Sequence, residues 1–221
     1  FAKRDVVRAG HAAPAALTPL VPALIASIAI AIPTSADVVL VRHYFAAQDA
    51  GAYAAVSTLG KVVVFGPLAV SLALFPSMVR EHAAGALPAG ALRRVVAATA
   101  AVAVPSAAAI LLAWAVAPGV IFARYNVAFP LIAMYLGAML AFSLVVSLVY
   151  FALARRQTSV IAVVPLGLAV ELVIVAAWHP SGAATASVLL AGNLALLAGV
   201  TWRCVAAPAV GVTVTDGTSP A

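Results

Sequence analysis

Apolar residues fill almost the whole chain in six long stretches, which short and more polar segments separate. A helix needs about 20 apolar residues to cross the roughly 30 Å hydrocarbon core of a bilayer. The stretches lack the charged face of a water-soluble helix and the alternation of a barrel strand. We therefore predict an all-α integral membrane protein with six transmembrane helices, near residues 19–41, 57–79, 95–117, 129–153, 160–177 and 184–205.

The composition supports a membrane environment. Hydrophobic residues make up 66% of the chain and charged residues 8%, which leaves too little polar surface for a water-soluble protein. The net charge of +6 does not indicate nucleic acid, because the basic residues lie between the apolar stretches without a basic stripe. We expect membrane lipids as partners and no nucleic acid. The single cysteine, Cys204, excludes a disulfide within the chain.

The basic residues also predict the orientation. Alternate segments between the apolar stretches hold nine of them against two in the other segments, Arg42 and Arg124. The positive-inside rule then places both termini in the cytoplasm, in a multi-pass protein of the plasma membrane. We predict one six-helix domain over residues 1–206. The polar segment 207–221 is rich in small residues and is expected to be a disordered cytoplasmic tail.

Two charged residues lie within the first two predicted helices. Asp37 and Lys61 each lie about one turn inside the expected outer end, and consecutive helices run antiparallel. Equal depth predicts that the two side chains pair. The pair either lines an outward-facing cavity and contacts an anionic group, or it is structural, with Lys61 extending to the interface.

Glu171 is the only acid near the centre of any predicted helix. It lies about 9 Å from the outer end of the fifth helix, and Asn193 of the sixth helix lies at a similar depth. We predict a hydrogen bond between them across the short hairpin. The bond belongs either to a proton or cation site of a transporter, or to a protonated glutamate that holds two helices together.

No enzyme signature is present. The sequence has no phosphate-binding loop, no metalloprotease or hydrolase motif and no clustered carboxylates, and its histidines are scattered. We therefore expect no catalytic residue, no cofactor and no metal site.

Four short segments carry a resemblance to a known family. They are Asp37 to Lys61 with Gly51 and Tyr53, Leu74-Phe75-Pro76, the run from Pro118 to Phe122 with Tyr125, and Tyr150 to Arg155. In order and spacing they resemble the lipid-linked oligosaccharide flippases of polysaccharide biosynthesis, in the multidrug/oligosaccharidyl-lipid/polysaccharide exporter superfamily. The resemblance extends to about Arg203. It departs from the family at Arg124, where many relatives carry glycine.

The resemblance implies one half of a pseudo-symmetric bundle of twelve to fourteen helices. The chain begins with Phe1 and matches the second half, so we expect an N-terminal half, or a second copy of the chain, as partner. In the family, Gly51 and Tyr53 would lie in a short loop between two helices. The substrate would be a lipid-linked sugar, with Lys61 and Arg42 contacting its diphosphate and Asp37 beside them.

Three functions follow as hypotheses. The leading one is a flippase or exporter that translocates lipid-linked oligosaccharide or polysaccharide precursors by alternating access. The second is a cation-coupled drug antiporter of the same superfamily, with Glu171 and Asn193 as the ion-coupling residues. The third is a non-transporting membrane scaffold of envelope assembly, which would tolerate loss of all its intramembrane charges.

Overall fold

The structure is a computed structural model that describes residues 31, 33–85, 90–122, 125–155 and 157–206. Within these ranges the chain is helical and contains no strand. Most of the first predicted membrane helix and the whole predicted tail lie outside the described residues. The helices are α3 (Pro33–Tyr44), α4 (Ala47–Ala83), α5 (Ala91–Val116), α6 (Pro118–Ile121), α7 (Phe129–Ala154), α8 (Thr158–Ala177) and α9 (Gly182–Ala206).

Four of the described helices, α4, α5, α7 and α9, are long and apolar enough to cross a membrane. A shorter apolar segment, Val163–Ala177, lies within α8. The expected class, an all-α protein embedded in a membrane, agrees with these helices. A bundle with six membrane-spanning helices stays a prediction.

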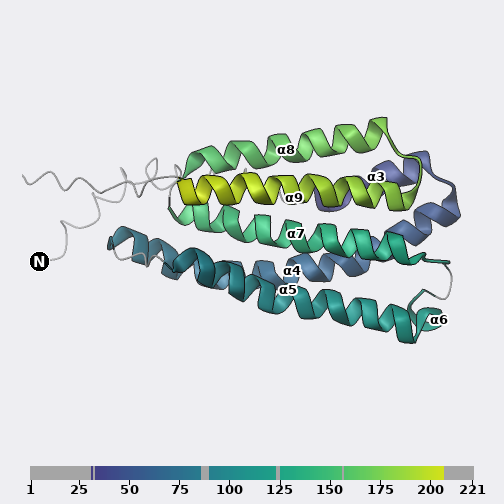
Figure 1. Cartoon of the computed structure of the whole chain (residues 1–221), viewed down its shortest axis with the longest axis horizontal. Helices are drawn as coiled ribbons and strands as arrows, with labels where there is room; N and C mark the ends of the chain where they lie inside the picture. The colour runs from purple at the N-terminus through teal and green to yellow at the C-terminus, as the bar shows by residue number, and fades with distance from the viewer. Residues whose placement is uncertain (1–30, 32, 86–89, 123–124, 156, 207–221) are drawn as a thin grey trace, which may run out of the picture.

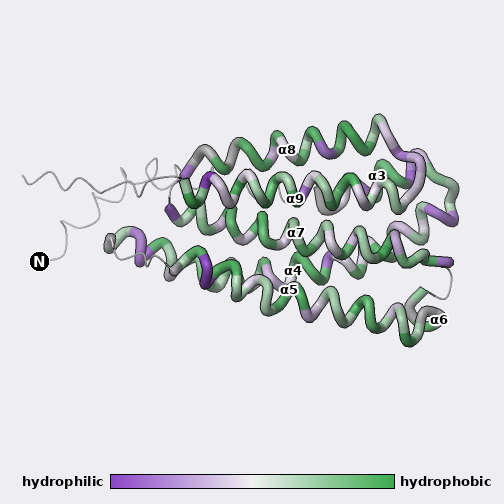
Figure 2. The backbone as a smooth tube through the Cα atoms, viewed as in Figure 1, coloured by the Kyte–Doolittle hydropathy of each residue, from purple (hydrophilic) through white to green (hydrophobic). Residues whose placement is uncertain are grey.

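The helix α7 forms the centre of the bundle. It packs against α4, α5, α8 and α9, and most of its residues are buried. Figure 1 shows α8 and α9 on one side of α7, and α4 and α5 on the other. Proline in the first turn starts α7, where its missing N–H costs no helical hydrogen bond. Green, hydrophobic positions dominate every long helix in Figure 2, as a lipid environment requires.

The helix α4 is much longer than its apolar core. It begins at Ala47 and has 37 residues, which corresponds to about 55 Å. The prediction of a loop around Gly51 and Tyr53 was therefore wrong, because the alanine-rich segment from Ala47 continues as helix. Gly51 packs so closely on the ring of Tyr125 that a Cβ atom at position 51 would overlap Cε1 of the ring.

A buried cluster of hydroxyl groups joins three helices. The Oγ atom of Ser147 on α7 lies 2.8 Å from that of Ser71 on α4. The hydroxyl of Thr99 on α5 donates to the same Ser147 oxygen at 2.7 Å. Hydrogen bonds of this kind hold helices together where lipid provides no hydrophobic driving force between them.

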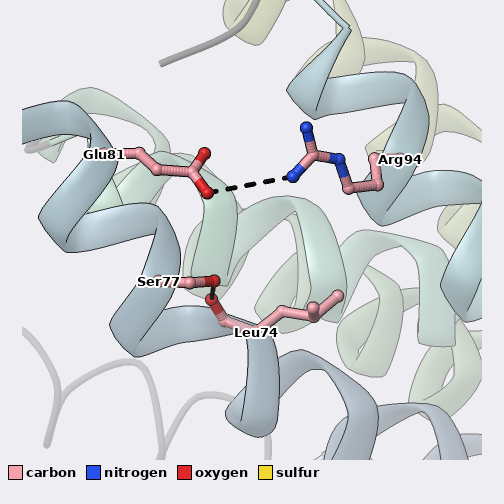
Figure 3. A network of polar contacts seen from close by, with 4 residues as sticks. All are labelled: Leu74, Ser77, Glu81 and Arg94. Atoms are coloured by element: carbon pink, nitrogen blue, oxygen red, sulfur yellow. Dashed lines mark hydrogen bonds and ion pairs between the residues drawn. The ribbon is translucent and has the colours of Figure 1, made fainter. Parts of the chain in front are cut away.

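The ends of the bundle agree with the alternation of charge. The connections α4–α5 and α7–α8 lie at one end, and α3–α4, α5–α7 and α8–α9 at the other (Figure 1). At the first end Arg94 pairs with Glu81 at 3.8 Å (Figure 3), an exposed contact that contributes little to stability. At the same end Arg155 donates to the carbonyl oxygen of Cys204 at 3.1 Å. Which end faces the cytoplasm stays a prediction.

Candidate ion-coupling site

Asp37 is the centre of a buried polar network. Its side chain is 1% exposed, on α3. The hydroxyl of Tyr53 on α4 donates to Asp37 Oδ2 at 3.1 Å, and the hydroxyl of Tyr135 on α7 donates to the same oxygen at 2.9 Å. Hydrogen bonds donated to a carboxylate offset part of the cost of burying its charge.

The two tyrosines are held in place by their surroundings. Both are fully buried, and their rings meet edge to face with centroids 5.4 Å apart. The Tyr135 hydroxyl also lies 2.8 Å from the Oγ atom of Ser57 on α4. Because Tyr135 donates its single proton to Asp37, Ser57 is the donor in this second bond. The order of donation therefore runs from Ser57 through Tyr135 to Asp37.

The second acid, Glu171, contacts α9. Its Oε1 atom accepts a hydrogen bond from Asn193 Nδ2 at 3.3 Å, which confirms the predicted contact between these two residues. Asn193 also donates to the carbonyl oxygen of Leu189 at 2.9 Å. Ser181 begins α9 by accepting the backbone N–H of Ala184 at 3.1 Å, and this cap fixes the short turn from α8. The turn places the two side chains at similar depth.

Both acids line one small cavity. Asp37, Glu171 and Asn193 form its polar part, and apolar side chains from α7, α8 and α9 line the rest. Its volume is about 20 Å³. A cavity needs about 10–15 Å³ measured in this way to hold one water molecule. The space therefore accommodates one particle of about that size.

Three oxygen atoms at this cavity are unsatisfied. Asp37 Oδ1, Glu171 Oε2 and Asn193 Oδ1 are buried and have no hydrogen-bond partner within the part of the chain that the structure describes. They come from three different helices, α3, α8 and α9. A buried polar atom without a partner costs about 1–3 kcal/mol. All three are acceptors, so a cation or a proton donor would satisfy them.

The predicted pairing of Asp37 with Lys61 was wrong. The two residues form no ion pair, and Asp37 bonds the tyrosines instead. The prediction assumed that Lys61 lies one turn inside its helix, but α4 begins at Ala47 and Lys61 is much deeper. Lys61 is half-buried, four residues after Ser57, and Arg42 is exposed in the last turn of α3. Neither cation contacts the cavity.

Sequence reasoning did not assign Tyr53, Ser57 and Tyr135 to the site. Tyr53 was expected in a short loop between two helices, but it lies within α4 and is buried. Tyr135 carries a hydroxyl group about 9 Å inside α7, where a buried tyrosine needs a hydrogen-bond partner. That requirement is the signal that could have linked it to an acid at the same depth.

Comparisons with known proteins do not assign the chain to a family. The chain matches no family model, and no curated protein or solved structure matches it significantly. No group of three or more His, Cys, Asp or Glu side chains suitable for a metal ion occurs among the described residues. The site therefore has to be interpreted from its own two acids and its asparagine.

Proposed function

We propose that this chain is part of a sodium-coupled membrane transporter of the flippase or exporter type. The observation that carries the proposal is the small cavity at which Asp37, Glu171 and Asn193 leave three oxygen atoms without partners. Ionisable residues inside a membrane are costly, and they commonly mark ion pathways and coupling sites. A purely structural glutamate would not need a second acid beside it.

The oxygens favour a sodium ion over a proton as their ligand. Alkali ions bind carboxylate and amide oxygens, and a sodium ion takes several at once. A proton on one carboxyl oxygen satisfies that atom and one further acceptor, which leaves the third oxygen without a partner, whereas one sodium ion can contact all three. The cavity of about 20 Å³ also has room for a small ion.

The site lies where a coupling ion can act on helix packing. Its ligands come from α3, α8 and α9, while the tyrosines extend the contact to α4 and α7. Sodium would therefore favour the arrangement of helices in which these side chains converge. A ligand shifts a conformational equilibrium by its difference in affinity between the two states, which is the basis of alternating access.

We assign lipid-linked oligosaccharide or polysaccharide precursors as the cargo. The support is the resemblance to flippases and the positions of Lys61 and Arg42, two cations that do not line the acidic cavity. A diphosphate headgroup requires cations and the sodium site requires acids, so the two ligands would use different side chains. The complete transporter would include a further half or a second copy of the chain.

A second candidate is a sodium-coupled drug antiporter, which the buried Glu171 favours equally. The two candidates share the coupling site and differ in cargo. Transport assays with a lipid-linked oligosaccharide and with a lipophilic cation therefore separate them. A cargo that carries diphosphate would depend on Lys61, and a cationic drug would not.

Sodium binding tests the proposal directly. We expect sodium chloride to raise the unfolding temperature of the purified full chain in lipid nanodiscs more than potassium chloride does. Glu171→Gln and Asp37→Asn should abolish this difference. Asp49→Asn, in the exposed first turn of α4, is the matched control and should retain it.

Transport in proteoliposomes completes the test. We expect cargo translocation driven by a sodium gradient in the wild type, and its loss in Glu171→Gln. If a variant with Asp37, Lys61 and Glu171 all neutralised supports envelope assembly as well as wild type, the protein is a scaffold. If translocation is driven by a proton gradient and does not depend on sodium, the coupling ion is a proton and the sodium proposal is wrong.

A further inference from the structure

We propose that Tyr53 and Tyr135 are positioning residues that orient Asp37 toward the cavity and thereby set the affinity and selectivity of the site for sodium. The inference rests on the proposed function, because it needs a cation at the cavity. It adds two residues from α4 and α7 that do not line the cavity themselves.

The hydrogen bonds divide the carboxylate of Asp37 into two unlike oxygens. Both hydroxyls donate to Oδ2, at 3.1 Å from Tyr53 and 2.9 Å from Tyr135. The other oxygen, Oδ1, is buried and has no partner within the described residues. Two bonds from different helices prevent rotation of the carboxylate, so Oδ1 remains the oxygen available to a cation.

Packing fixes the positions of the two tyrosine rings, so they cannot adjust when a different ion is bound. Each is fully buried, and the edge-to-face contact between them fixes their relative orientation. The backbone of Gly60 on α4 lies against the Tyr135 ring, where a Cβ atom would be 2.5 Å from Cε1. Ser57, which is also on α4, fixes the Tyr135 hydroxyl by a hydrogen bond.

A fixed carboxylate discriminates between ions of different size. A carboxylate that rotates freely can adjust its distance to sodium or potassium, whereas one held by surrounding hydrogen bonds keeps one distance. Residues that orient the ligands of a bound metal commonly change its affinity by about 10–100-fold when they are removed. The tyrosines should therefore affect both the sodium affinity and the preference for sodium over potassium.

Removal of a single hydroxyl group tests the role. The full chain in nanodiscs is titrated with sodium, lithium and potassium chloride at constant ionic strength, and the midpoint of the rise in unfolding temperature gives the apparent affinity. We expect Tyr53→Phe and Tyr135→Phe each to lower the apparent sodium affinity about tenfold and to reduce the preference for sodium over potassium. Tyr125→Phe is the matched control, because Tyr125 is exposed and does not line the cavity.

The outcomes separate this inference from the proposed function. A structural role alone would lower the unfolding temperature in every salt and leave the midpoints and the ion preference unchanged, which would overturn the inference. If wild type responds to sodium and Glu171→Gln does not, but both phenylalanine variants match wild type, the sodium site stands and the positioning role fails. If wild type shows no response specific to sodium, both proposals fail.

Discussion

The carboxyl group of Glu171 on α8 lies directly against Gly192 on α9. A Cβ atom at position 192 would be 2.8 Å from Glu171 Cδ and 3.0 Å from Oε2. The glycine therefore makes the space that the acid occupies at the cavity. Asn193, the next residue, donates to the other carboxyl oxygen at 3.3 Å. Two consecutive residues of α9 thus provide the position and the hydrogen bond of one acid.

This contact predicts the effect of Gly192→Ala. The added methyl group should push the flexible end of Glu171 away while leaving the helices packed, because the clash is with a side-chain terminus. We expect sodium affinity to fall by about tenfold, measured by the sodium-dependent rise in unfolding temperature. Gly199→Ala on the same helix is the control, since a Cβ atom there meets nothing within 4 Å. Equal sodium responses in the two variants would contradict the prediction.

The hydroxyl cluster predicts a loss of stability without a loss of ion binding. Ser147→Ala removes the oxygen that Ser71 and Thr99 both contact. We expect the free energy of unfolding in detergent micelles to fall by about 1 kcal/mol, a common size for hydrogen bonds between membrane helices. Ser106→Ala is the comparison, because that hydroxyl bonds only a carbonyl of its own helix. The prediction is wrong if both changes cost the same.

Replacement of Lys61 should affect cargo translocation without abolishing ion binding. Lys61→Ala should reduce translocation of lipid-linked oligosaccharide by about tenfold, because a hydrogen bond to a charged phosphate is worth about 1.5–3 kcal/mol. Sodium binding should be retained and membrane insertion unchanged, since Lys61 does not line the acidic cavity. Arg93→Ala, an exposed cation at the end of the bundle where α5 begins, serves as the control. Normal translocation by Lys61→Ala would remove this lysine from the cargo site.

The charge alternation predicts which end of the bundle faces outward. Cys204 is the chain's single cysteine and is buried, so Cys204→Ser provides a background for labelling. In intact cells, a membrane-impermeant thiol reagent should modify Ser181→Cys, in the α8–α9 turn, and should spare Ala84→Cys, after α4. The reverse pattern would invert the topology that the positive-inside rule gives.

Some of the site could be predicted from the sequence, and the reason is local. Glu171 and Asn193 lie on consecutive helices joined by a short turn, so counting residues from that turn gives each depth. The same reasoning failed for Asp37 and Lys61, because it depended on where α4 begins. Hydropathy marks the apolar core of a helix, but an alanine-rich helix continues beyond that core.

The sequence by itself determined the class of this protein. Long apolar segments require a lipid environment, and a backbone in lipid must satisfy its hydrogen bonds within helices. The partners of Asp37 were decided by the tertiary structure alone. Tyr135 is 98 residues away along the chain, and its hydroxyl reaches Asp37 only because α7 packs in the centre of the bundle. Hydropathy does not specify which faces of apolar helices meet, since lipid and helix are equally apolar, so close packing and buried hydrogen bonds decide it.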